Sequence, residues 1–182
     1  MITIRQIQEL QEVEHFEPLE KAVNYISIVR KMSIDKVEEM PMNEIMSIYK
    51  DILTELENYP KEPKYKFKIN GRRFQMIHNA MDISADQFIS LQQYTPQEIV
   101  TNLHRIMATL TNEVNWYGKV KPIKNKREHF DELSEIFLDL DFHIANSYAV
   151  FFSLLYPKLL DATLFYLQME MTRLENLQTQ TP

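Results

Sequence analysis

The dipeptide Asn70-Gly71 restricts the fold of this chain more than any other feature of its sequence. Both residues accept the positive φ angles of a type I′ turn, and the runs beside them alternate apolar with basic or polar side chains. The pattern predicts a β-hairpin over residues 64–77. Its apolar face comprises Tyr65, Phe67, Ile69, Phe74 and Met76. Because an isolated two-stranded hairpin is only marginally stable in water, we expect this face to pack on helices, or on strands of another copy or partner.

Helical periodicity surrounds the predicted hairpin, because apolar side chains recur at intervals of three and four residues on both sides of it. The expected helix starts are Pro18, Ser33, Asn43, Ser84 and the capping box Thr95-Pro-Gln-Glu98. The sequence therefore predicts a mainly α (α+β) protein, a helical bundle with one central hairpin, in a single domain over residues 1–182. Its parts are an acidic helical part over 1–60, the hairpin over 64–77 and a helical part over 84–178.

Three segments of the C-terminal half have patterns of their own. From Thr111 to Asn125 the helical periodicity fades, and we expect a long loop from Trp116 to Pro122. Residues 142–156 are apolar nearly all round, which predicts a helix enclosed by other helices or by neighbouring subunits. A last helix is expected from Leu160 to Leu177.

Composition excludes several classes of function. The chain has no cysteine, so it has neither disulfides, nor a thiol nucleophile, nor a cysteine-ligated metal centre. Its two glycines, Gly71 and Gly118, are too few for the glycine-rich loops that bind phosphate. No run of about 18 apolar residues and no export signal is evident, which predicts a cytosolic product without a membrane span.

Candidate catalytic and metal-binding patterns are weak. Glu12 and His15 have the spacing of a di-iron helix motif, but the motif occurs once where such sites need it twice. Asp139 and His143 lie one turn apart without a third ligand nearby, so we expect Asp139 or Asp141 to cap the following helix instead. The sequence therefore predicts no enzymatic activity, no metal and no cofactor.

Charge is unevenly distributed along the chain. Residues 1–62 carry 7 basic and 13 acidic side chains, whereas the remainder carries 13 of each. Two basic clusters hold 11 of the 20 lysines and arginines. The first, on the predicted hairpin, comprises Lys61, Lys64, Lys66, Lys68, Arg72 and Arg73. The second, after Trp116 and Tyr117, comprises Lys119, Lys121, Lys124, Lys126 and Arg127.

Three explanations of these clusters stay open. Lysines protect exposed strand edges from aggregation and keep loops solvated. The clusters could instead face an acidic surface, such as the N-terminal third of a neighbouring copy. Basic side chains interleaved with aromatic ones can also follow a nucleic-acid backbone. The methionines have two possible roles, as core residues or as an adaptable surface for a partner. They include Met40, Met42, Met46, Met76 and Met81.

Between about Val23 and Leu155 the chain has a series of short motifs. In order, they are a helical region with Met40-Pro41-Met42, the Asn70-Gly71 hairpin, the helix with Gln87-Phe88-Ile89, the segment Asn102 to Met107 and the late pair Phe151-Phe152. This series resembles that of small tailed-phage morphogenesis proteins, namely the tail-assembly and head–tail ring proteins of crAss-like phages.

The resemblance implies a non-enzymatic, homo-oligomeric ring or connector subunit of the virion, made in the host cytoplasm. Its partners would be further copies of itself and other tail or portal proteins, without membrane or, in the main, nucleic acid. A tail-assembly chaperone confined to the host cytoplasm is the first alternative, and a nucleic-acid accessory protein is the second. The expected interaction residues are Lys64, Lys66, Lys68, Arg72, Arg73, Phe74, Trp116, Tyr117, Lys119, Lys121, Lys124, Lys126 and Arg127.

Overall fold

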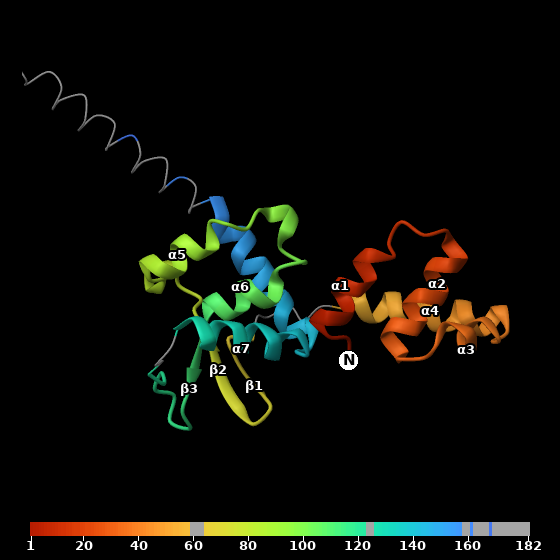
Figure 1. The fold of residues 1–182 in the computed structure, drawn as a ribbon, viewed down its shortest axis with the longest axis horizontal. Coiled ribbons are helices and arrows are strands. Elements are labelled where there is room, and N and C mark those ends of the chain that lie inside the picture. Colours follow the sequence, from red (N-terminus) through yellow and green to blue (C-terminus); the bar gives the residue numbers. More distant parts are fainter. Residues whose placement is uncertain (59–63, 123–125, 158–160, 162–167, 169–182) are drawn as a thin grey trace, which may run out of the picture.

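The computed structural model describes residues 1–58, 64–122, 126–157, 161 and 168, and it has an elongated shape with two helical parts (Figure 1). One end consists of the first four helices. The other contains the remaining helices and a small antiparallel sheet. The predicted mainly helical α+β class is therefore confirmed. No described helix has both the length and the apolar composition that crossing a membrane requires. Most of the helix predicted from Leu160 to Leu177 lies outside the described residues.

Four helices build the N-terminal part. They are α1 (Ile4–Glu12), α2 (Pro18–Arg30), α3 (Ile34–Glu38) and α4 (Met42–Glu57). Pro18 starts α2 as predicted, because its fixed φ suits the first helical position. The expected cap at Asn43 is wrong, because α4 begins one residue earlier and its cap position is Pro41. Ala22, Ile26 and Ile52 are fully buried where these helices pack together.

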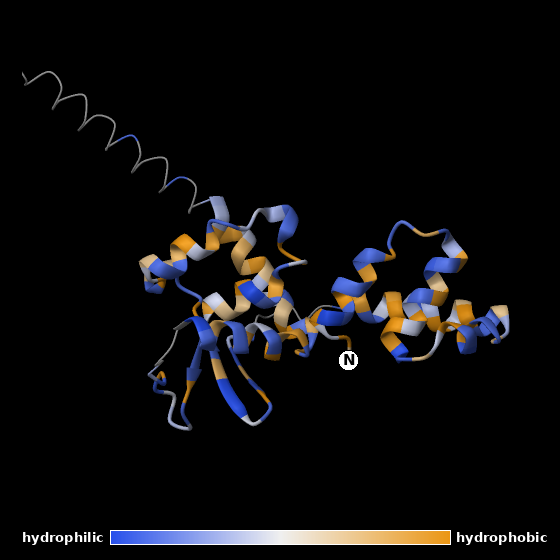
Figure 2. Ribbon diagram, viewed as in Figure 1, coloured by the Kyte–Doolittle hydropathy of each residue, from blue (hydrophilic) through white to orange (hydrophobic). Residues whose placement is uncertain are grey.

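The predicted hairpin is confirmed. Strands β1 (Lys66–Ile69) and β2 (Arg72–Met76) pair antiparallel with Phe67 opposite Phe74. Asn70 and Gly71 both have positive φ angles, 49° and 75°, as a type I′ turn requires. Hydrophilic residues are prominent along this hairpin (Figure 2).

The segment from Thr111, where the helical periodicity fades, begins with a strand that was not predicted. Residues Thr111–Val114 form a third strand, β3, which pairs antiparallel with β2 and gives the sheet the order β1-β2-β3. Val114 also forms an antiparallel bridge with Val120, so the chain reverses direction after β3 in a second hairpin, whose turn is longer than that of the first. The sequence lacks the apolar–polar alternation of a strand here, because the inward-facing residues Thr111 and Glu113 are polar.

Helices of the same chain cover the apolar face of the sheet. The ring of Phe137 packs edge-on against Phe67 and Phe74, with ring centroids 5.8 and 5.2 Å away, and Tyr148 contacts Phe67 from the last described helix. Phe74, Phe137 and Tyr148 are at most 1% exposed. The hairpin therefore finds the apolar cover that it needs within one chain, whereas Tyr65, predicted on the same face, is 40% exposed.

The remaining elements surround this core. They are the 3-10 turns η1 (Ala80–Asp82) and η2 (Pro96–Glu98), the helices α5 (Ala85–Leu91), α6 (Leu103–Leu110) and α7 (Lys126–Leu138), and the helix over 142–157. The capping box at Ser84 starts α5 as predicted. The box at Thr95 forms too, but it opens η2 rather than a long helix. Asp141 caps the last described helix by accepting from the backbone N–H of His143, which confirms the predicted cap.

The two parts join through the first residues of the chain. Ile4 donates its backbone N–H to the Leu140 carbonyl, and Phe142 donates to the Ile2 carbonyl, at 3.1 and 2.8 Å. Gln8 on α1 contacts Nδ1 of His104 on α6 through its side-chain nitrogen. Burial, with a smaller effect of Arg105, lowers the pKa of His104. This imidazole is thereby favoured in its neutral form at the joint.

Candidate functional site

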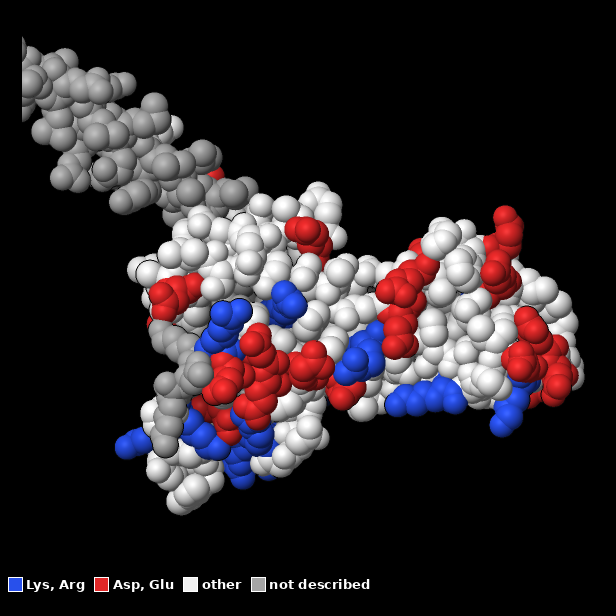
Figure 3. Space-filling model, viewed as in Figure 1, with Lys and Arg blue, Asp and Glu red and all other residues white. Residues whose placement is uncertain are grey.

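A basic surface covers the outer face of the sheet. Lys66, Lys68 and Arg73 point away from the core, as the strand alternation predicts, and Lys119 lies exposed beyond β3. We name these four residues the basic sheet surface. Lys and Arg gather at the hairpin end of the molecule, whereas Asp and Glu occupy much of α7 and of the N-terminal part (Figure 3). Lys64 is also exposed and precedes β1, where its backbone N–H donates to Ser147.

Two of the predicted interaction residues are engaged within the chain. Arg72 donates from Nε and Nη2 to the same carboxylate oxygen of Glu113, and from Nη1 to Glu132 on α7. Lys121 donates to the second carboxylate oxygen of Glu113. Burial opposes the ionisation of Glu113, but the hydrogen bonds from the two cations outweigh it and lower its pKa. Arg72 and Lys121 therefore contribute to the stability of the sheet, and their charges are already paired with Glu113 within the chain.

This arrangement makes the stability depend on pH. The Glu113→Gln variant is expected to lose about 1–3 kcal/mol of unfolding free energy near pH 7, because a buried charge-assisted contact is removed. The pKa of Glu113 is lower in the folded chain than its ordinary 4.5. Its contribution is therefore complete above 4.5 and is lost as the pH falls through the folded value.

Urea unfolding of wild type and variant at about pH 7 and at about pH 3 checks this, and the difference between them should shrink at the lower pH. Glu132→Gln is the matched control. That carboxylate also binds Arg72 but is 54% exposed, so its loss should cost less than about 1 kcal/mol. A difference between Glu113→Gln and wild type that is the same at both pH values would contradict the assignment.

The second hairpin carries an exposed aromatic tip. Trp116 and Tyr117 are 77% and 58% exposed and touch edge-to-face, with ring centroids 5.0 Å apart. The turn beneath them is held by Asn115, which accepts from the N–H of Gly118 and of Lys119. Gly118 has a φ of 85°, a conformation that glycine adopts without strain. Arg73 donates to the Trp116 carbonyl, and the Lys119 ammonium lies 5.9 Å from the Tyr117 ring centroid. We name Trp116 and Tyr117 the aromatic tip.

The remaining predicted residues are not brought together with these. Phe74 is wrong as an interaction residue, because it is 1% exposed and belongs to the core beneath the sheet. Lys124 lies outside the described residues. Lys126 is the first residue of α7, and Arg127 lies exposed at the edge of a pocket.

Sequence reasoning missed an apolar groove in the N-terminal part. It encloses about 830 Å³ between α2, α3 and the start of α4. Its apolar lining is Phe16, Leu19, Val23, Ile34, Met40, Met42 and Ile45, and its polar lining is Glu17, Glu20, Asn24 and Glu38. We name this the acidic groove. Leu19 fits the apolar stripe of α2, yet it is 46% exposed because no helix of the described chain covers that part of the stripe. Periodicity assigns such a residue to the apolar face of its helix. Only the packing of α2 against its neighbours shows that the side chain is exposed to solvent.

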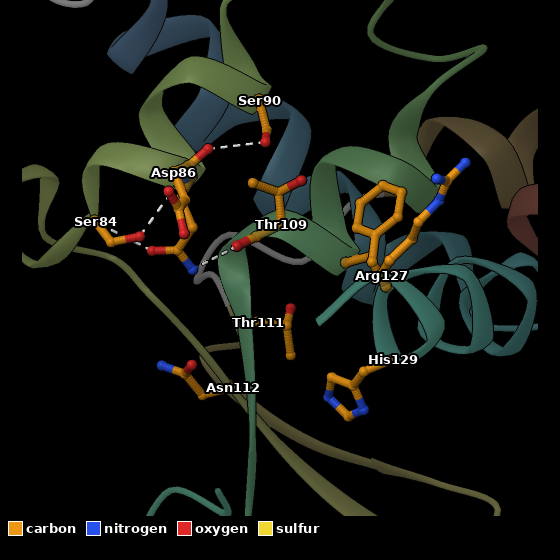
Figure 4. A pocket seen from close by; sticks show the side chains of 11 residues that line it. Ser84, Asp86, Ser90, Thr109, Thr111, Asn112, Arg127 and His129 are labelled. Atoms are coloured by element: carbon orange, nitrogen blue, oxygen red, sulfur yellow. Dashed lines mark hydrogen bonds between the residues drawn. The ribbon is translucent and has the colours of Figure 1, made fainter. Parts of the chain in front are cut away.

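A second, more polar pocket of about 560 Å³ lies between α5, α6, β3 and α7 (Figure 4). Most of its polar side chains take part in local hydrogen bonds. Ser84 caps α5, Gln87 donates to the Thr109 carbonyl, and Thr111 donates to the Tyr148 hydroxyl. Arg127 and His129, both from the start of α7, point in different directions. The buried Nε2 atom of His129 has no hydrogen-bond partner among the described residues.

The candidate metal motifs gain no further ligands from the fold. Among the residues that the structure describes, no three His, Cys, Asp or Glu side chains are grouped as a metal site. Glu12 and His15 are both exposed, at the end of α1 and in the turn that follows it.

Comparison with protein-family models, curated proteins and solved structures gives no significant match for this chain.

Proposed function

We propose that this protein is a non-enzymatic, homo-oligomeric structural subunit of a tailed phage, which forms a ring or connector at the head–tail or tail assembly. The phage setting rests on the sequence resemblance. The mode of assembly rests on the charge distribution of the folded chain. Successive copies associate when the basic sheet surface of one copy meets the acidic N-terminal part of the next.

The separation of charge to opposite ends of the molecule carries this proposal. Residues 1–58 hold 12 acidic and 6 basic side chains, while the basic sheet surface lies at the far end of the long axis (Figures 1 and 3). The two surfaces are too distant to meet within one chain. A contact between two different surfaces is heterologous, and repetition of it produces a closed ring or an open filament. Complementary charges favour this contact and set its orientation.

The polar groups of the described chain support a structural role. Hydroxyl and amide groups around the polar pocket cap helices and bind backbone carbonyls. The most buried carboxylate of the sheet, Glu113, is held between Arg72 and Lys121. These groups contribute to the fold, which leaves the outer charges and the aromatic tip as the surfaces directed towards partners.

Self-association should depend strongly on salt. Light scattering across a range of protein concentrations is expected to show a high-order oligomer at low ionic strength that dissociates as salt is raised towards 1 M. At that concentration the Debye length falls to about 3 Å and contacts between exposed charges are screened. A monomer at every protein and salt concentration would rule out the proposed mode of assembly.

A tail-assembly chaperone is the second candidate, and the acidic groove favours it. The groove includes Met40 and Met42, whose flexible side chains adapt to different apolar partners. Mass spectrometry of purified particles separates the two functions. A ring subunit is present at a fixed stoichiometry, whereas a chaperone binds a tail protein in the infected cell but is absent from the particle.

A further inference from the structure

The aromatic tip and the acidic groove have complementary properties, which bear on how copies of the chain could contact each other. The aromatic tip is a small apolar projection with basic neighbours. Arg73 donates to its backbone, and Lys119 lies beside the Tyr117 ring. The acidic groove is an apolar recess with glutamates on its lining. Tip and groove are therefore complementary in apolar character and in charge.

The aromatic tip has the composition of an interface anchor. Tryptophan, tyrosine and arginine are the residues most enriched among those that dominate binding energy. Trp116 is exposed over three quarters of its surface, whereas Phe74, Phe137 and Tyr148 beneath the sheet are buried. The turn also holds the two rings in place, because both Asn115 and Arg73 bind its backbone. A rigid anchor loses little conformational freedom when it binds.

The acidic groove has the properties of a binding site for an apolar group with basic neighbours. Its volume lies within the range of pockets that enclose organic ligands. Leu19, Ile34 and Met42 are each between 44% and 54% exposed there, which makes the groove an apolar surface in contact with solvent. Glu17, Glu20 and Glu38 add three negative charges next to it.

We propose that the aromatic tip of one copy inserts into the acidic groove of the next copy. This inference rests on the proposed self-association and names the contact that mediates it. Tip and groove lie at opposite ends of the long axis, so a second copy must supply the partner (Figure 1). Arg73 and Lys119 would then lie near the groove glutamates, with the two rings on the apolar lining.

Charge also distinguishes this occupant from the C-terminal segment of the same chain. Residues 158–182 carry two basic and three acidic side chains, so they do not complement the glutamates of the groove. The tip, in contrast, has Arg73 and Lys119 beside it and contains no acidic side chain between Asn115 and Lys121. The segment that complements the groove glutamates is therefore the aromatic tip with Arg73 and Lys119.

Tryptophan fluorescence provides a direct test, because Trp116 is the only tryptophan of the chain. As protein concentration rises at low salt, its emission is expected to move to shorter wavelength in parallel with the oligomer seen by light scattering. The Leu19→Glu and Met42→Glu variants place charge in the groove. Each should raise the concentration needed for both signals by roughly tenfold or more, as should Trp116→Ala for light scattering.

Met81→Glu is the matched control. Met81 is 88% exposed, but it lies at η1, away from both tip and groove, so this variant should assemble as wild type does. Circular dichroism of every variant checks that the helices are retained. The contact is overturned if the oligomer forms while Trp116 emission stays that of an exposed indole and the groove variants assemble normally. The proposed self-association survives that outcome, whereas a chain that stays monomeric removes both.

Discussion

Replacing Phe137 by alanine is expected to reduce the free energy of unfolding by about 3–5 kcal/mol, the range for large aromatic-to-alanine changes in cores. Phe137 is fully buried, and its ring contacts both Phe67 and Phe74 beneath the hairpin. Its loss leaves a cavity between α7 and the sheet that the strands cannot close without breaking their register. Since domains are stable by about 5–15 kcal/mol, urea unfolding should detect this loss readily.

Phe130→Ala is the matched control, because it makes the same chemical change on the same helix at a half-buried position. It should cost less than half as much, since less apolar surface is removed from the core. Equal losses at the two positions would contradict the view that α7 replaces a partner in covering the hairpin.

The second large effect concerns assembly. Reversing two charges of the basic sheet surface, in the Lys66→Glu/Lys68→Glu variant, is expected to weaken self-association at least tenfold at low salt, because attraction to the acidic N-terminal part becomes repulsion. Both lysines are exposed on an outer face, so the fold should be retained. Sedimentation or light scattering across protein concentrations measures the change. At high salt, variant and wild type should converge.

The Lys36→Glu/Lys50→Glu variant controls for net charge. Both double variants change the net charge from −6 to −10, since each of the two reversals contributes −2. Lys36 and Lys50 are exposed in the N-terminal part, where added negative charge should preserve or strengthen attraction to the basic sheet surface. If both double variants dissociate to the same extent, overall repulsion is responsible and the specific contact between the two surfaces is refuted.

Much of the secondary structure follows from local signals. The Asn70-Gly71 turn, the start of α2 at Pro18 and the caps at Ser84 and Asp141 all form as predicted, since each depends on backbone energetics within a few residues. Strand β3 was missed because its inward-facing side chains include a threonine and a glutamate. Their partners, Tyr148 and Arg72, lie 37 and 41 residues away.

The candidate site was predicted only in part. Alternation along β1 correctly puts Lys66 and Lys68 on the outer face. The same alternation places Arg72 on the inner face with Phe74. The prediction of Arg72 as an exposed interaction residue was therefore inconsistent with the two-residue period of the strand. The acidic groove could not be anticipated, because it forms where α2, α3 and α4 leave a gap and no single helix contains its pattern.

The sequence by itself determined the hairpin, most helix starts and the unequal charge of the two parts, because turn, cap and charge are properties of neighbouring residues. Only the tertiary structure decided which basic side chains are neutralised, that Phe74 is buried beneath a helix, and that the aromatic tip and the acidic groove lie at opposite ends. Those outcomes depend on packing and ion pairs between residues distant in the chain, and a local pattern does not encode such distances.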